Sequence, residues 1–116
     1  MQTMIDYKFG DVVLVPFPFT DQSTSKKRPG VVVSSGDYNC ERPDLVIMAA
    51  TSQIKAPSPF GEITITQWKQ AGLLKPSVIK PIFTTVEKKL ILKKLGRLGK
   101  KDRQCLQKNL SMLLGE

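Results

Sequence analysis

Short apolar runs, separated by polar and turn-forming residues, follow one another along most of the chain, a pattern typical of β-strands. Residues 11–17 form the first run and residues 30–35 the second. Residues 45–51 are apolar at successive positions, which predicts a central strand that is buried on both faces. Residues 62–65 alternate between polar and apolar side chains and therefore predict a half-buried strand.

The second half of the chain continues this pattern with interruptions. Residues 77–80 and 82–86 are predicted to be two strand pieces broken by Pro81, because proline has no backbone N–H to donate to a sheet. Residues 90–98 predict the last strand, in which Gly96 marks a bulge or a tight bend.

The segments between the strands contain the residues that favour turns and helix ends. Residues 36–44 and 52–59 are rich in turn-forming residues and predict loops. Thr66 is predicted to cap a short helix that ends just before Gly72, since glycine is the usual residue after a helix end. Trp68 is expected to pack this helix onto the sheet.

The C-terminal segment, residues 101–114, has the periodicity of a helix. Leu106, Leu110 and Leu113 fall at positions i, i+4 and i+7, and Asp102 suits the first turn. We expect this leucine stripe to pack against the core rather than to bind a partner. The fold class predicted is mainly β with short helices: a small, strongly bent β-barrel with a C-terminal α-helix packed outside it.

The length and the apolar content limit the organisation of the protein. Its 116 residues predict a single domain, residues 1–116. No apolar run approaches the length of a membrane span, and the N-terminus lacks the apolar stretch of a secretory signal. Cys40 and Cys105 lie far apart in different kinds of segment, so we expect two free thiols in a cytoplasmic protein.

Positive charge is concentrated in the second half of the chain. Residues 1–68 carry 6 basic and 7 acidic side chains, whereas residues 69–116 carry 12 basic and 3 acidic ones, and the formal net charge is +8. This asymmetry favours a polyanion or an acidic protein as a partner. A solvated basic surface without such a partner remains the alternative.

The chain contains no histidine, which excludes several classes of catalytic site. Serine–histidine and cysteine–histidine pairs are absent, and so are histidine metal ligands. Two scattered cysteines cannot form a structural zinc site by themselves. We therefore expect no metal and no cofactor, and any catalysis must use carboxylates, Arg, Lys, hydroxyl groups or the substrate's own groups.

The segment between the first two apolar runs is the strongest candidate for a ligand-binding site. A Ser/Thr-rich segment, residues 21–25, joins them and ends in Lys26, Lys27 and Arg28, at the mouth of the second strand. A guanidinium fixed at such a position can bind a phosphate group.

Four short motifs in this order carry a resemblance to a known family. They are GDVVLV (10–15), KRPGVVV (27–33), ATSQ (50–53) and KLGRL (94–98). Together they resemble the MazF/PemK family, the toxin halves of prokaryotic toxin–antitoxin pairs, over roughly residues 8–114. The resemblance implies an SH3-like barrel, usually a homodimer, that is neutralised by a small acidic antitoxin.

The resemblance also implies an activity, a metal-independent endoribonuclease that cuts single-stranded RNA at short sequences. In that family the 2′-hydroxyl of the RNA attacks the adjacent phosphorus, which leaves a 2′,3′-cyclic phosphate and a 5′-hydroxyl. The catalytic arginine of the family falls on Arg28 and the catalytic threonine on Thr51. A guanidinium can bind two phosphate oxygens and stabilise the charge of the transition state, and a threonine hydroxyl adds one neutral donor.

Further residues near these two are expected to bind the RNA, because unstacked bases favour aromatic faces and amide hydrogen bonds. The expected substrate-binding residues are Phe19, Thr20, Ser25, Lys26, Lys27, Ser52 and Gln53. Phe17 or Phe19 could instead belong to the core.

The chain departs from the family pattern at two places. Some members carry a glutamate in the first polar loop, where this chain has Thr24 or a neighbour, and Asp21 is the nearest carboxylate. The general base is therefore unassigned. Well-studied members carry an Arg-Thr pair where this chain has Thr84 and Thr85, which leaves base specificity and dimer contacts open.

Two other functions fit the same fold. One is a non-enzymatic toxin that binds and poisons DNA gyrase, and the other is a catalytically inactive RNA-binding relative. Fold alone does not separate them. The Lys-Lys-Arg-Pro segment together with Thr51, Ser52 and Gln53 favours the ribonuclease, because a gyrase-binding protein has no need of these residues.

Overall fold

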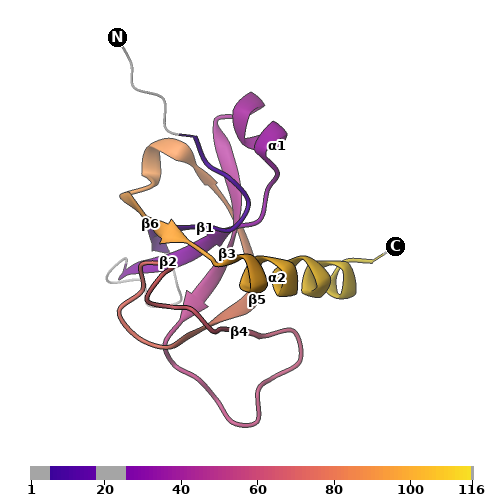
Figure 1. The fold of residues 1–116 in the computed structure, drawn as a ribbon. Coiled ribbons are helices and arrows are strands. Elements are labelled where there is room, and N and C mark those ends of the chain that lie inside the picture. The colour runs from indigo at the N-terminus through magenta and orange to yellow at the C-terminus, as the bar shows by residue number, and fades with distance from the viewer. Residues whose placement is uncertain (1–5, 18–25, 116) are drawn as a thin grey trace.

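The structure, a computed structural model, describes residues 6–17 and 26–115. Over these residues, six strands form one curled antiparallel sheet, which two helices accompany (Figure 1). The order of the strands in the sheet is β4-β5-β3-β2-β1-β6. The elements are β1 (Asp11–Phe17), β2 (Lys26–Val32), α1 (Gly36–Glu41), β3 (Asp44–Thr51), β4 (Ile63–Ile65), β5 (Ser77–Glu87), the 3-10 turn η1 (Lys88–Leu90), β6 (Lys93–Arg97) and α2 (Lys100–Leu113).

The predicted fold class, mainly β with a C-terminal helix, is confirmed. The central position predicted for the third strand is also correct, because β3 lies between β5 and β2 and is buried on both faces. β2 begins earlier than the predicted residue 30, since Lys26, Lys27 and Arg28 already pair with β1. The cationic segment is therefore part of a strand rather than of the preceding loop.

Residues 36–44 were expected to form a loop, and this prediction is wrong. They contain the helix α1, whose first turn is capped by Ser35 accepting a hydrogen bond of 3.2 Å from the Tyr38 N–H. Ser, Asp and Asn favour both turns and helix starts, because their side chains hydrogen-bond locally to the backbone. Composition alone could not separate the two.

The predicted break of the fifth strand at Pro81 is also wrong. β5 runs without interruption, and Pro81 falls within a shift of its register against β3, between the pairs Met48↔Phe83 and Ala50↔Ile79. A bulge tolerates proline because the ladder hydrogen bonds are already interrupted there. Gly96 does stand at a bulge, since the register of β6 shifts between its pairs with Val12 and Val13.

The predicted short helix after Thr66 is a turn that is closed by a Schellman motif. The Gly72 N–H donates to the Lys69 carbonyl at 3.0 Å, and the Leu73 N–H donates to the Trp68 carbonyl at 2.9 Å. Gly72 has a φ of +86°, in the left-handed region that glycine adopts after a helical turn, so its predicted place just beyond the turn is confirmed. Trp68 packs against the core as expected.

Asp102 of α2, not Thr66, caps the start of this turn. Its carboxylate is buried and accepts three hydrogen bonds, from the Thr66 N–H at 3.2 Å, the Thr66 hydroxyl at 2.8 Å and the Gln67 N–H at 3.1 Å. One side chain of the terminal helix thus fixes the start of the turn that follows β4.

The end of the same turn lies against β6 at a contact between two backbone segments. A Cβ atom at Gly72 would lie 2.1 Å from the Leu95 carbonyl oxygen, and one at Gly96 would lie 2.6 Å from the Ala71 carbonyl oxygen. Only glycine fits at either position. Because β4 and β6 are the two edges of the sheet, this contact brings the chain after one edge against the other edge.

The core consists of two apolar clusters, and successive residues of the central strands alternate between them. Met48 and Ala50 belong to the first cluster, together with Leu106, whereas Ile47 and Ala49 belong to the second. The expected packing of the leucine stripe is confirmed, since Leu106 is buried and Leu110 and Leu113 pack against the first cluster.

Cys40 and Cys105 are both free, as predicted, and both are exposed. None of the helices found in residues 6–17 and 26–115 is long and apolar enough to cross a membrane.

Replacing Asp102 by alanine should lower the free energy of unfolding by about 2–3 kcal/mol, because it leaves two backbone N–H groups and a hydroxyl of the turn without their acceptor. Urea and thermal unfolding measure this, and Tm should fall by roughly 10 °C. Gln104→Ala, an exposed position on the same helix, is the control and should change stability little. Equal stability of the two variants would contradict the capping role.

Candidate active site

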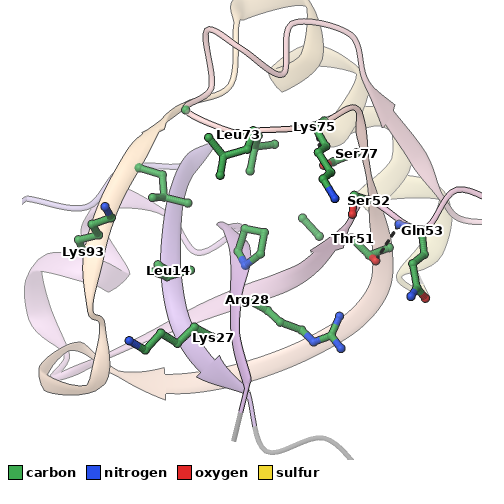
Figure 2. Close-up of a pocket in the computed structure, with 15 residues that line it drawn as sticks. Leu14, Lys27, Arg28, Thr51, Ser52, Gln53, Leu73, Lys75, Ser77 and Lys93 are labelled. Carbon is green, nitrogen blue, oxygen red and sulfur yellow. Dashed lines mark hydrogen bonds between the residues drawn. The ribbon is translucent and has the colours of Figure 1, made fainter.

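The main pocket opens where β2 and β3 meet the connection between Gly72 and β5, and its volume is about 480 Å³. This volume lies within the range of roughly 300–1,000 Å³ that is common for ligand sites. Figure 2 shows the side chains around it. The described residues that line it are Leu14, Lys27, Arg28, Pro29, Ala50, Thr51, Ser52, Gln53, Gly72, Leu73, Leu74, Lys75, Ser77, Lys93 and Leu95.

Arg28 and Thr51 reach this pocket from neighbouring strands. β2 and β3 pair in the register Gly30↔Ala49, Val31↔Met48 and Val32↔Ile47. Continuing this register by two residues places Arg28 opposite Thr51, and side chains opposite each other on paired strands project from the same face. Two residues that are far apart in the sequence therefore become cross-strand neighbours.

Thr51 also organises the residues that follow it. Its Oγ1 accepts a hydrogen bond of 3.1 Å from the Gln53 N–H, which the dashed line in Figure 2 marks. This local bond turns the chain at the end of β3 and keeps Ser52 and Gln53 at the rim of the pocket. Because a hydroxyl can accept and donate at once, the Thr51 O–H remains able to donate to a ligand.

The structure brings together five of the residues singled out from the sequence: Lys27, Arg28, Thr51, Ser52 and Gln53 line one pocket. The others cannot be placed. Phe19, Thr20, Ser25, Asp21 and Thr24 fall outside the described residues. Lys26 is the first residue of β2, but its side chain is not described either.

Two cations in the pocket were not predicted from the sequence. Lys93 comes from β6, and Lys75 comes from the connection that follows Gly72. Both positions depend on how the barrel closes, which local periodicity does not reveal. The sequence holds one local indication for Lys75, which is that Pro76 follows it. A residue before proline favours an extended conformation, which suits a segment at the rim of a pocket.

The electrostatics of the pocket favour an anion. Its lining includes four cations, Lys27, Arg28, Lys75 and Lys93, and no acidic side chain among the residues that the structure describes. Leucine, proline and alanine side chains form the surface between these cations. Such a site suits a ligand that combines phosphate groups with planar, weakly polar rings. In the same part of the chain no group of three or more Cys, Asp or Glu could hold a metal ion.

Other cations of the basic half serve the fold instead. Asp11 is buried, and its carboxylate lies 3.0 Å from the Lys94 Nζ and 3.6 Å from the Arg97 Nε. Burial, reinforced by the nearby Asp11 charge, raises the pKa of Tyr7 beside this group. Since side chains alternate along a strand, Lys93 faces the pocket while Lys94 turns to Asp11.

Comparison with protein families decides to which family the chain is related. The family described as "PemK-like, MazF-like toxin of type II toxin-antitoxin system" matches residues 8–114. The chain belongs to this family. A search of curated proteins gave no match.

Solved structures of the same family share the fold. MazF from Deinococcus radiodurans superposes with a TM-score of 0.73 at 18% identity, covering 97% of this chain and 100% of the other. A MazE–MazF structure from the same organism gives 0.72 at 20% identity, over 96% and 98% of the two chains. An endoribonuclease in complex with its cognate antitoxin, from a mycobacterial species, gives 0.71 at 16% identity, over 94% and 93%. These similarities confirm the small MazF-like barrel.

The hydrogen bond from Gln53 to Thr51 should be visible in amide exchange. Thr51→Val removes the acceptor, whereas Thr51→Ser keeps it, so the Gln53 N–H should exchange up to about fivefold faster in the valine variant only, for a bond of net strength near 1 kcal/mol. Hydrogen exchange followed by NMR measures this. Equal exchange in both variants would show that the turn does not depend on this hydroxyl.

Proposed function

We propose that this protein is an endoribonuclease toxin that cleaves single-stranded RNA, including mRNA, at selected sequences without a metal ion or a cofactor. The observation that carries the proposal is that Arg28 of β2 and Thr51 of β3 line one pocket from adjacent strands, together with four cations in all and no acidic side chain in its described lining. Family membership supports the same conclusion, and one structural relative is described as an endoribonuclease.

The chemistry requires little from the protein beyond charge and positioning. The RNA's 2′-oxygen attacks the adjacent phosphorus, the bond from phosphorus to the 5′-oxygen breaks, and the products are a 2′,3′-cyclic phosphate and a 5′-hydroxyl. The 2′-hydroxyl loses its proton and the leaving 5′-oxygen gains one. Arg28 binds the non-bridging oxygens and stabilises the added negative charge, and Thr51 donates a further hydrogen bond to one of them.

Proton removal from the 2′-hydroxyl is not assigned to any side chain. The guanidinium of Arg28 has five N–H donors and no acceptor, so it serves as a donor rather than as a base. No carboxylate lines the pocket in the parts of the chain that are described, and Asp21 lies outside them. We infer that catalysis depends mainly on charge stabilisation and on in-line positioning of the 2′-oxygen.

The RNA on either side of the cleaved bond would contact the remaining polar groups of the rim. Lys27 suits a phosphate, and the side chains of Ser52 and Gln53 suit base edges, which single-stranded RNA exposes. Phe19, Thr20, Ser25 and Lys26 stay predicted RNA contacts on sequence grounds alone.

The proposal includes the partners and location expected from the family. A small antitoxin would cover the cationic pocket with an acidic segment that folds on binding; two of the structural relatives are complexes with an antitoxin. The toxin would act in the cytoplasm as a homodimer, and two-fold dimers are the commonest oligomers in general.

Cleavage of a long single-stranded RNA in the presence of EDTA tests the activity. Removing a group that stabilises transition-state charge costs about 10²–10³ in kcat, so we expect a loss of this size for Arg28→Ala and a smaller one for Thr51→Ala. Arg42→Ala and Thr64→Ala, at exposed positions away from the pocket, are the matched controls. A 2′-deoxy substitution at the cleaved nucleotide should preserve binding and abolish cleavage.

Absence of cleavage by the wild-type protein would refute the enzyme and leave the gyrase-binding or the inactive RNA-binding alternative. Undiminished cleavage by Arg28→Ala would refute the assigned role of that residue.

Neutralisation provides a separate test of the partner. The short acidic protein expected to be encoded beside this toxin should bind it, inhibit cleavage in competition with RNA, and bind less tightly as the salt concentration rises. Sedimentation of the toxin alone, and then of the complex, should show a homodimer in both. Inhibition that RNA does not relieve would mean that the antitoxin covers a different surface.

A further inference from the structure

The connection from Gly72 to β5 forms a wall of the pocket for which neither the sequence nor the comparisons suggest a role. Leu73, Leu74, Lys75 and Ser77 line the pocket from this connection. Leu74 is 93% exposed, more than any other large apolar side chain in the described part of the chain. Figure 2 shows the Lys75 side chain extending from this wall toward Ser52 at the end of β3, with Arg28 beyond it.

The backbone of this wall is held in place at both ends. At its start, Gly72 lies against the backbone of β6. At its end, the buried Ser77 hydroxyl donates to the Lys75 carbonyl at 2.9 Å, and Pro76 keeps Lys75 extended. The position of the Lys75 backbone is therefore fixed, although its side chain reaches into solvent.

The ammonium group of Lys75 forms none of the ion pairs found among the described residues. No carboxylate among the described residues lies within ion-pair distance of its ammonium group, in contrast to Lys94, which pairs with Asp11. An ammonium group is a compact charge with three donors and binds phosphate oxygens without demanding one orientation. Such a group suits a phosphate whose position is less constrained than that of the phosphate held by Arg28 and Thr51.

Leu74 adds an apolar surface next to this charge. An exposed leucine beside a lysine, on a wall of fixed backbone, offers single-stranded nucleic acid a cation for its backbone and an apolar surface against which a base can pack. Leu73, which is buried, continues this apolar surface into the pocket.

We propose that the wall formed by residues 73–77 is a second RNA-binding element, in which Lys75 binds a phosphate next to the cleaved one and Leu74 packs against a neighbouring base. This inference rests on the proposed function, since it assumes that Arg28 and Thr51 hold the cleaved phosphate. Ser77 is a positioning residue, because it acts only through the Lys75 backbone.

The test compares Lys75→Gln with Lys108→Gln, an exposed position on α2 outside the pocket with the same change of charge. Binding is measured with a single-stranded RNA that carries a 2′-O-methyl group at the cleaved nucleotide, over a range of salt concentrations. Lys75→Gln should weaken binding about tenfold at low salt and reduce the slope of log K against log salt by about 0.7, the value for one phosphate contact on a single strand. Lys75→Arg should restore both.

Cleavage kinetics complete the test. Lys75→Gln should raise KM with little change in kcat, since the lysine binds a phosphate that does not react. Leu74→Ala should raise KM several-fold without changing the salt slope, because it removes an apolar contact and no charge. Equal Tm values for these exposed variants and the wild type would show that all of them are folded.

The outcomes separate this inference from the proposed function. If the wild type cleaves RNA, and Lys75→Gln matches Lys108→Gln in affinity and salt slope, the wall is not an RNA contact and the enzyme proposal stands. If the wild type binds RNA without cleaving it, and Lys75→Gln but not Lys108→Gln lowers the RNA affinity and its salt slope, residues 73–77 are an RNA-binding element and the enzyme proposal is refuted. A Lys75→Gln variant that loses antitoxin inhibition but binds RNA normally would assign the wall to the antitoxin and overturn the inference.

Discussion

The rest of the structure depends on the contact between the backbone at Gly72 and the backbone of β6 at Leu95 and Gly96. Neither position has room for a Cβ atom, so the curled sheet can close only with glycine at both. Asp102 fixes the start of the turn that leads to this contact, and the Schellman motif fixes its end. The curled sheet is therefore closed by two features: the lack of space for a side chain at Gly72 and Gly96, and the hydrogen bonds from the turn to Asp102 of the terminal helix.

The same contact creates the pocket. It places the chain after Gly72 across from β2 and β3, whose register, continued from Gly30↔Ala49, puts Arg28 opposite Thr51. The two sides of the pocket thus have different origins. One side is set by pairing within the sheet, and the other by the way in which the sheet closes. A change that loosened the Gly72 contact would displace Lys75 while leaving the Arg28–Thr51 pair intact.

This difference in origin explains what the sequence could and could not predict. The central strand, the terminal helix and the Gly96 bulge follow from local patterns and were predicted correctly. The run predicted as a strand over residues 90–98 was too long, because Leu90 belongs to η1 and β6 covers only Lys93–Arg97. Arg28 and Thr51 were found through short motifs, and the structure places both in one pocket. Lys75 and Lys93 were missed because only the closed barrel brings them there. The α1 helix was missed because its Ser35 cap has the composition of a turn, and the unbroken β5 was missed because a bulge accommodates Pro81.

The positive charge is divided between ion pairs that stabilise the fold and cations that line the pocket. Asp11 of β1 forms ion pairs with Lys94 and Arg97 of β6, and these pairs join the first strand to the last. The buried carboxylate also offsets part of the positive charge of β6. The adjacent Lys93 faces the pocket, because side chains alternate along the strand. One short strand therefore contributes cations to ion pairs on one face and to the lining of the pocket on the other. Since repulsion among the four pocket cations opposes folding when no anion is bound, RNA or an acidic antitoxin segment should stabilise the fold as it fills the pocket.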